Sequence, residues 1–391
     1  MRSKKYLLHI LMFFYFASGA IMFPYLSIHL SKNLRPSEIG ILMAIIPTSM
    51  LLLQPFWGWA ADKWGPGKVL KFTLIFTILS AGGFLFVTSF NGFFTVLLIY
   101  SIFAASINSL IDATVLSFKN DKYGSIRLWG SIGYGVAAFL GGLFKSSILG
   151  FWSFAIHITL LVVTLVIVLR LPNNHSAAGN KKVSIRNRMD FSHFYFFKNT
   201  RFILLLFSLF LTGVVLKGYE IFFPVGLNNL KASGLILGSA WVIEILPEVF
   251  LFYFLDRIIG RISPWLILLS GTVLYIVRVG ILGFFPVLWV WVASQPVSSI
   301  AFTLWYFGSV KLVNKMVNIG QKSTGQAVFW SVSYGAGGLT GSFLSGQLVN
   351  VFGIFSYFKV AALICCLSVM VLVFLSKTEK ASTSYINEQS I

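Results

Sequence analysis

Four carboxylates lie within stretches of the chain that are otherwise almost entirely apolar. They are Asp112, Glu220, Glu244 and Glu248, out of only 11 acidic residues in total. A carboxylate near the middle of a membrane helix costs about 2.5–3.5 kcal/mol, so chains rarely retain one without a use for it. Three basic residues lie in or beside similar stretches: Arg127, Lys217 and Arg278. This pattern predicts a pathway through a bilayer for a polar substance.

The spacing of these charges indicates which of them share a helix face. Glu244 and Glu248 are four residues apart, so both project from one face of a helix. Two nearby carboxylates rarely ionise together, so one of them is expected to hold a proton near neutral pH. This makes the pair a candidate proton carrier. Lys217 and Glu220 are one helical turn apart, and this spacing favours a local ion pair.

Residue patterns for other chemistry are missing from the sequence. We find no glycine-rich phosphate cradle, no metal-ligand cluster and no nucleophile–base pair. Cys365 and Cys366 are adjacent, which precludes an ordinary disulfide between them, and they are interpreted as core residues. The sequence therefore predicts a protein that is not an enzyme and that needs neither a cofactor nor a metal.

The composition places these residues in a membrane protein. The chain is 57% hydrophobic and 10% charged, with a mean hydropathy of +0.85. A membrane-spanning helix needs about 20 mostly apolar residues. Continuous runs of that length favour helices over a transmembrane barrel. Twelve such runs are expected, at 7–30, 38–60, 70–90, 92–116, 128–147, 150–170, 202–228, 233–255, 263–283, 286–310, 324–348 and 353–375.

The net charge of +19 is a signal of topology and not of nucleic-acid binding. Most of the 30 Lys and Arg residues fall in segments on the side of the two termini, which indicates that both termini are cytoplasmic. The opposite segments hold only Lys32, Arg35, Lys145, Lys231 and Lys359. A cleaved signal peptide is the alternative for the basic start, but the first apolar run continues to Leu30 and eleven more follow. We expect a multi-pass protein of the plasma membrane.

The longest polar stretch, residues 172–200, divides the chain into two halves. Its Pro, Asn, Ser, Gly and basic residues are typical of a linker. We therefore expect an N-terminal six-helix bundle at 1–171 and a C-terminal six-helix bundle with a short cytoplasmic tail at 201–391. Two complete halves in one chain need no partner, so a monomer is expected.

The two halves repeat several short patterns in the same order. Phe23-Pro24 recurs as Phe223-Pro224, and Gly40 with Asp62 recurs as Gly234 with Asp256. The third echo is Ser131, Tyr134 and Gly135 with Ser331, Tyr334 and Gly335. Duplicated halves place a solute site at their interface, near the bilayer midplane, and rocking of the halves gives alternating access.

The segment GWAADKWGPGK (58–68) resembles the signature loop of the major facilitator superfamily. The matching positions are Gly58, Asp62, Lys63, Gly65 and Lys68. In that family the loop contributes to a charge network that holds the inward gate, so the resemblance implies a gating role for Asp62. Asp256 with Arg257 is its counterpart in the second half. An ordinary basic loop is the alternative. The implied fold is all-α, with twelve transmembrane helices in two pseudo-symmetric six-helix bundles.

A closer resemblance involves YGSIRLWGSIGYG (123–135), FPYLSIHL in the first apolar run, and Asp112. These are similar to the branch that contains lactose permease, nucleoside–proton symporters and phenylpropionate permease. The resemblance implies that Asp112 and Arg127 grip solute hydroxyls and that Tyr134 stacks on a ring. An Arg fork beside a carboxylate can bind several hydroxyls. A buried structural ion pair is the alternative.

The same resemblance assigns roles in the second half. Glu244 lies close to a sugar-contacting position, Glu248 matches an acidic position of the phenylpropionate type, and Arg278 matches an Arg that serves proton coupling. A structural partner for a glutamate is the alternative for Arg278. The chain departs from lactose permease at SQPVSSIAFTLW (294–305), where Gln295 and Ser298 replace an ionisable pair. Coupling by that arrangement is excluded, whereas coupling through Glu248 stays open, as does a proton-independent carrier.

These observations predict a transporter that takes up a small polar organic solute together with protons. A sugar or glycoside is the first expectation, and a nucleoside or aromatic acid is the second. The alternatives are a proton-driven exporter of hydrophobic compounds and a membrane sensor that transports nothing. The expected partners are the solute, protons and the lipid bilayer.

Overall fold

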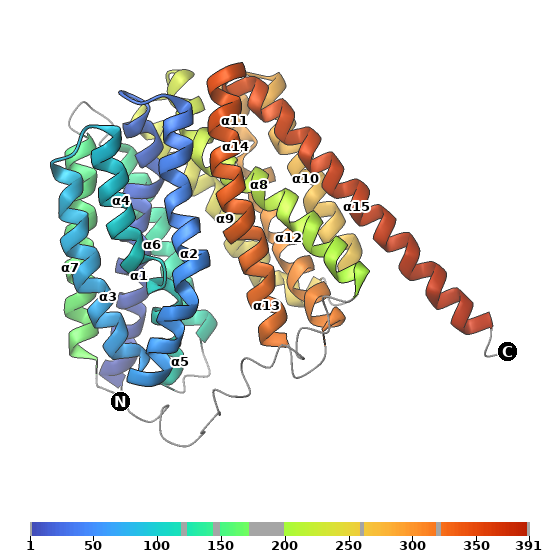
Figure 1. Ribbon diagram of the computed structural model, residues 1–391, viewed down its shortest axis with the longest axis horizontal. Coiled ribbons are helices and arrows are strands. Elements are labelled where there is room, and N and C mark those ends of the chain that lie inside the picture. Colours follow the sequence, from blue (N-terminus) through green and yellow to red (C-terminus); the bar gives the residue numbers. More distant parts are fainter. Residues whose placement is uncertain are drawn as a thin grey trace.

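The computed structural model describes residues 2–118, 123–143, 149–171, 199–258, 262–317 and 322–388. Throughout these residues the chain is helical and contains no strand. The predicted linker, 172–200, lies outside the described residues except for its last two positions, Asn199 and Thr200. The halves on either side of it form the two helical bundles that the sequence predicted (Figure 1).

The N-terminal bundle contains the first six membrane-crossing segments. Its elements are α1 (Arg2–Leu30), α2 (Pro36–Trp64), α3 (Pro66–Ala81) with the short 3-10 helix η1 (Gly82–Leu85), α4 (Phe90–Ala104) with α5 (Ile107–Ser117), α6 (Tyr123–Leu143) and α7 (Leu149–Arg170). Pro36 and Pro66 each stand in the first turn of their helices, where a missing N–H costs no hydrogen bond.

The C-terminal bundle repeats this plan. Its elements are α8 (Thr200–Asn229), α9 (Gly234–Ile258), α10 (Pro264–Phe284), α11 (Leu288–Ala293) with α12 (Gln295–Met316), α13 (Lys322–Trp330) with the π-helix η7 (Ser331–Ala336) and α14 (Gly337–Phe352), and α15 (Ile354–Glu388). The repeated proline lies inside the first helix of each half, at Pro24 in α1 and Pro224 in α8.

Nine segments of the described chain are long and apolar enough to cross a membrane. They coincide with nine of the twelve predicted runs. The other three runs, 128–147, 286–310 and 324–348, correspond to α6, to α11 with α12, and to α13 through α14. Two of these three are interrupted helices and all three carry polar or small residues, which lowers their hydropathy without removing them from the bundles.

Three membrane-crossing segments are interrupted where the sequence predicted continuous helices. The breaks lie between α4 and α5, between α11 and α12, and at η7. A break frees backbone groups that must find other partners inside a membrane. At the first break the Trp57 indole N–H donates to the carbonyl oxygen of Ile102 at 2.8 Å. Discontinuous helices of this kind commonly border the binding site of a transporter.

The halves meet mainly along two helix pairs, α2 with α14 and α6 with α9, and α1 also contacts α8 (Figure 1). The two main contacts are tightest near the face opposite the N-terminus. A Cβ atom on Gly40 would lie 2.5 Å from the Ser342 carbonyl oxygen and 2.9 Å from the Gly346 Cα. A Cβ on Gly142 would lie 2.6 Å from the Gly238 Cα. Only glycine permits such close backbone contact, so these positions seal that face.

The halves diverge toward the face that carries the N-terminus (Figure 1). Along α2, a Cβ on Gly335 would still lie 3.1 Å from Leu51, but one on Gly58 would meet nothing within 4 Å. The side chains of Glu220 and Trp330, on helices that pack within the C-terminal bundle, are 46% and 41% exposed. The space between the halves is therefore accessible from the face of the N-terminus and closed at the opposite face.

This asymmetry predicts that larger side chains at the glycine contacts force the closed face open. We expect Gly40→Val and Gly238→Val to lengthen the distance between the halves there, because neither backbone can move away without separating the bundles. The measurement is a spin-label distance between Lys32→Cys and Asn229→Cys, with Cys365 and Cys366 replaced by alanine. Gly280→Val is the matched control, since a Cβ there meets nothing within 4 Å. Unchanged distances in both variants would show that the glycines do not seal this face.

Candidate functional site

The centre of the C-terminal bundle holds a fully buried cation, Arg278 of α10. Its Nη2 donates to Gln295 Oε1 at 2.5 Å and to the Tyr219 hydroxyl at 3.3 Å. Its Nη1 donates to Ser294 Oγ and to the Trp291 carbonyl oxygen, the latter at 3.5 Å. The guanidinium thus ties together α8, α10 and the junction of α11 with α12.

Arg278 meets the interrupted segment at the carbonyl end of α11. A helix end leaves carbonyl oxygens without intrahelical partners and carries partial negative charge, which a cation stabilises. Ser294 occupies the break and donates through Oγ to the Trp291 carbonyl oxygen at 2.9 Å. The rings of Tyr219 and Phe223 lie 5.3 and 5.0 Å from the guanidinium carbon, so α8 adds cation–π contacts.

The negative charge that balances Arg278 belongs to Glu244 of α9. Ser298 Oγ donates to Glu244 Oε1 at 2.7 Å, and Gln295 Nε2 donates to Glu244 Oε2 at 3.3 Å. The Tyr219 hydroxyl lies 3.4 Å from Glu244 Oε1. Two side chains therefore connect the Glu244 carboxylate with the Arg278 guanidinium: the amide of Gln295 and the hydroxyl of Tyr219.

Gln295 is the bridge between these two charges, and its orientation is determined by its partners. Its Oε1 accepts from Arg278 and from the Tyr219 hydroxyl, the latter at 2.9 Å. Its Nε2 donates to Glu244 and to the Ala240 carbonyl oxygen, the latter at 3.0 Å. Since the side chain is fully buried, a flipped amide would oppose the contacts to Arg278, Glu244 and Ala240, whose donor and acceptor roles are fixed. A neutral residue thus links the cation to the anion.

Glu248 lies one turn further along α9 and has different surroundings. Its carboxylate interacts electrostatically with Glu244 on its own helix and with Arg127 of the N-terminal half. Tyr134 and Tyr334 also interact with it. The two glutamates do share a helix face, but the structure separates their roles: Glu244 balances Arg278, whereas Glu248 faces the opposite half.

On the N-terminal side the site is formed by α1, α5 and α6. The Arg127 guanidinium stacks over the Phe16 ring at 4.0 Å and interacts electrostatically with Glu248 and Tyr306. Asp112 of α5 and Arg127 of α6 both interact electrostatically with the hydroxyl of Tyr15 on α1. Of the predicted grip residues, Arg127 interacts with the C-terminal half, whereas the cited interaction of Asp112 is with Tyr15 of its own half.

The repeated tyrosines come together around the same carboxylates. Tyr134 of α6 interacts electrostatically with Glu220, Glu244 and Glu248. Tyr334 of η7 interacts with Glu220 and Glu248. The internal repeat in the sequence thus supplies one tyrosine from each half that interacts with these acidic groups.

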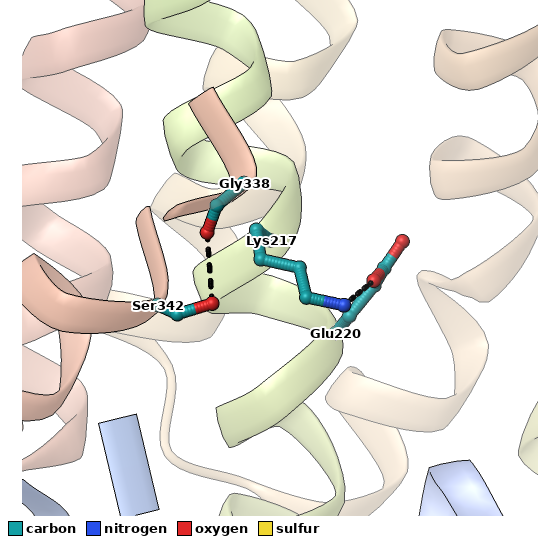
Figure 2. Close-up of polar contacts among 4 residues, drawn as sticks. All are labelled: Lys217, Glu220, Gly338 and Ser342. Carbon is teal, nitrogen blue, oxygen red and sulfur yellow. Dashed lines mark hydrogen bonds and ion pairs between the residues drawn. The ribbon is translucent and has the colours of Figure 1, made fainter. Parts of the chain in front are cut away.

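Lys217 and Glu220 form the local ion pair that the sequence predicted. Lys217 Nζ lies 3.0 Å from Glu220 Oε2, one turn apart on α8 (Figure 2). On the adjacent α14, Ser342 Oγ donates to the Gly338 carbonyl oxygen at 2.8 Å (Figure 2). Glu220 is half-exposed within the buried stretch of α8, Gly218–Leu227, and it interacts with Tyr134 of the other half. The pair therefore faces the space between the halves.

The predicted gating loop lies at the turn between α2 and α3. Gly65 has a φ of 91°, a conformation that favours glycine, and its N–H donates to the Ala61 carbonyl oxygen at 2.8 Å. Lys63 Nζ lies 5.1 Å from the Trp59 ring, while Gly58 and Lys68 are exposed. The side chains of Asp62, Asp256 and Arg257 lie outside the described residues, so their predicted charge network remains a prediction.

Sequence reasoning missed one polar cluster in the N-terminal half. The structure places His157 Nδ1 2.7 Å from the Ser18 carbonyl oxygen and Nε2 3.2 Å from the Tyr100 hydroxyl. Because a carbonyl only accepts, Nδ1 carries a proton. No spacing in the sequence relates these residues, since they come from three different helices.

Comparison with known proteins agrees with this architecture. The family model described as "MFS_1 like family" matches residues 6–360. The solved structure of the nucleoside transporter NupG superimposes with a TM-score of 0.83 at 21% identity, over 96% of this chain and 99% of that one. At this identity the likeness shows the fold alone.

Two curated relatives extend over nearly the whole chain. "Uncharacterized transporter YwbF" of Bacillus subtilis (strain 168) is 24% identical over 382 residues, which are 94% of this chain and 92% of the relative. The "Maltose permease" of Geobacillus stearothermophilus is 24% identical over 379 residues, 94% of this chain and 93% of the relative.

The hydrogen-bonded bridge predicts strong coupling between Arg278 and Glu244. Arg278→Met leaves a buried carboxylate without its counter-charge, and we expect a loss of about 3–5 kcal/mol in stability. Adding Glu244→Gln should recover much of this loss. The measurement is a double-mutant cycle of unfolding free energies in detergent.

Lys217→Met with Glu220→Gln is the control cycle for this prediction. Because that ion pair is partly exposed, its coupling should be only about 0.2–1 kcal/mol. Additive effects of Arg278→Met and Glu244→Gln would contradict the bridge.

Proposed function

Because the chain belongs to the MFS_1 like family, we propose that this transporter takes up a small polar organic solute together with protons by alternating access. A sugar or glycoside is the first candidate, and a nucleoside or aromatic acid is the second. We further propose that it lies in the plasma membrane as a monomer with both termini cytoplasmic. The distribution of Lys and Arg supports that orientation.

The observation that carries this proposal is the electrostatic interaction between Arg127 of one half and Glu248 of the other. Arg127 presents several N–H donors in one plane, and Glu248 presents only acceptors when ionised. A solute with hydroxyl groups can bind both at once, and it would then bridge the halves. Binding of this kind changes the energy of rocking, because each half contributes one side of the contact.

The balance of charge supports coupling to one proton. Seven charged side chains are connected through the site: Asp112, Arg127, Lys217, Glu220, Glu244, Glu248 and Arg278. Four are acidic and three are basic, so one proton on a carboxylate makes the set neutral. Charge in a membrane interior is costly, so the neutral set is the form best suited to rocking. Glu248 is our candidate for the proton site, since Glu244 is occupied with Arg278.

The accessibility of the space between the halves supports alternating access. One face is sealed by glycine contacts and the other is open, which is one of the two states that such a cycle needs. With cytoplasmic termini this is the inward-facing state. A proton moving inward supplies about 2.3 kcal/mol per 100 mV of membrane potential, enough to concentrate a neutral solute tens-fold.

The relatives support the solute classes without deciding between them. One is named a maltose permease, and a "Sucrose permease" of Escherichia coli matches 34% of this chain at 27% identity. The similar solved structure is a nucleoside transporter. Sugars and nucleosides both combine a ring with hydroxyl groups, which suits a site with carboxylates, an Arg and two tyrosines.

The experiment is uptake into vesicles reconstituted with the purified protein. Maltose, sucrose, uridine and adenosine are tested with and without an imposed pH gradient. We expect one of them to accumulate only with the gradient. Replacing Glu244 and Glu248 together by Gln should abolish accumulation and leave some exchange, and Glu248→Gln alone should do the same. Glu38→Gln is the control, because Glu38 lies at the start of α2, where it accepts from the Arg35 N–H at 2.7 Å.

Two outcomes would argue against this proposal. Undiminished gradient-driven uptake by the double variant would remove the proton role from α9. Solute binding that survives Arg127→Ala unchanged would favour the alternative, an exporter of hydrophobic compounds, because such a cargo makes no use of a guanidinium.

A further inference from the structure

Three aromatic side chains of the C-terminal half form a continuous surface, which we call the aromatic platform. They are Tyr306 of α12, Trp330 at the end of α13, and Tyr334 of η7. The ring centroids of Trp330 and Tyr334 are 4.6 Å apart, and those of Tyr306 and Trp330 are 5.7 Å apart. These separations are those of rings in contact.

Trp330 and Tyr334 are neighbours because they are four residues apart on one helical segment, Trp330 at the end of α13 and Tyr334 in the π-helix η7. The Ser333 carbonyl oxygen packs directly against Gly213 of α8, where there is no room for a side chain. π-helical turns are rare and occur frequently at functional sites.

The platform lies close to the N-terminal half, since a Cβ atom on Gly335, the residue after Tyr334, would lie 3.1 Å from Leu51 of α2. Tyr334 interacts electrostatically with Glu220 and Glu248, and Tyr306 interacts with Arg127 of the other half. Trp330 lies between these two tyrosines and is 41% exposed. Behind the platform, Trp305 and Phe329 are fully buried and support it.

The position of the platform relative to Tyr134 indicates a ligand. Tyr134 and Tyr334 are counterparts in the internal repeat, and both interact with Glu220 and Glu248. Each half therefore contributes a tyrosine that interacts with the same two acidic groups. A solute that uses both features has hydroxyl groups at one end, for the carboxylates and Arg127, and a flat ring at the other.

We propose that Trp330 and Tyr334 form a stacking subsite for an aromatic ring of the transported solute, as in a nucleoside or an aryl glycoside. This inference rests on the proposed function and narrows its solute class. Stacking on an aromatic side chain contributes enough to change affinity by about tenfold or more for each ring. A solute that has hydroxyl groups alone gains less from this surface.

The test compares binding of three probes to the purified full-length protein by isothermal titration calorimetry. Uridine and p-nitrophenyl glucoside carry an aromatic ring, and maltose does not. We expect Trp330→Leu to weaken binding of the ring-bearing probes about tenfold, with Trp330→Phe restoring most of it. Maltose binding should change little. Trp289→Leu is the matched control, because Trp289 is 66% exposed on α11, away from the platform.

Two results would overturn the subsite. One is an equal loss for maltose and the ring-bearing probes in Trp330→Leu, which would indicate a packing role. The other is saturable binding of maltose with none of the ring-bearing probes. The proposed function fails differently, through a lack of gradient-driven uptake. Ring-probe binding that depends on Trp330 would still support the subsite in that case.

Discussion

The buried charge of Arg278 is the constraint on which the C-terminal half depends. A guanidinium removed from water must be balanced and hydrogen-bonded, or it destabilises the fold by several kcal/mol. Here the balance is assembled from α8, α9 and the junction of α11 with α12, through Tyr219, Glu244 and Gln295. Because four membrane-crossing segments contribute to one network, their relative positions are coupled. Gln295 hydrogen-bonds to both Arg278 and Glu244, so the two charges balance each other without direct contact. Glu248 is therefore not needed to balance Arg278.

A contrast in packing explains how such a network can serve movement. At the sealed face the halves touch through glycine backbones. Elsewhere between the halves Arg127 and Glu248 interact electrostatically. A backbone contact without charged side chains can open without separating an ion pair, whereas an interaction between charges responds to a proton or a solute. The glycine contacts therefore suit gating, and the interaction between charges suits recognition of a proton or a solute.

Particular residues show which features can be predicted from the sequence and which depend on tertiary contacts. The pair of Lys217 and Glu220 was predictable, because residues one turn apart on a helix are neighbours whatever surrounds them. Glu244 and Glu248 share a face for the same reason, but their separation into two environments depends on what α10, α12 and α6 place opposite each carboxylate. Gln295 looked like a missing ionisable group, and its role emerges only with Arg278 and Glu244 on either side. His157 has partners on two other helices, which no local pattern records.

The sequence by itself determined the membrane class, the twelve crossing segments, the internal repeat and the set of embedded charges. These follow from hydropathy, spacing and composition, which are local properties of the chain. The tertiary structure alone decided which charges meet, which face is sealed, where helices break, and that Tyr134 and Tyr334 interact with the same carboxylates. Such facts depend on contacts between helices far apart in the chain. A buried charge takes the partners that packing brings within reach, and packing is a property of the whole fold.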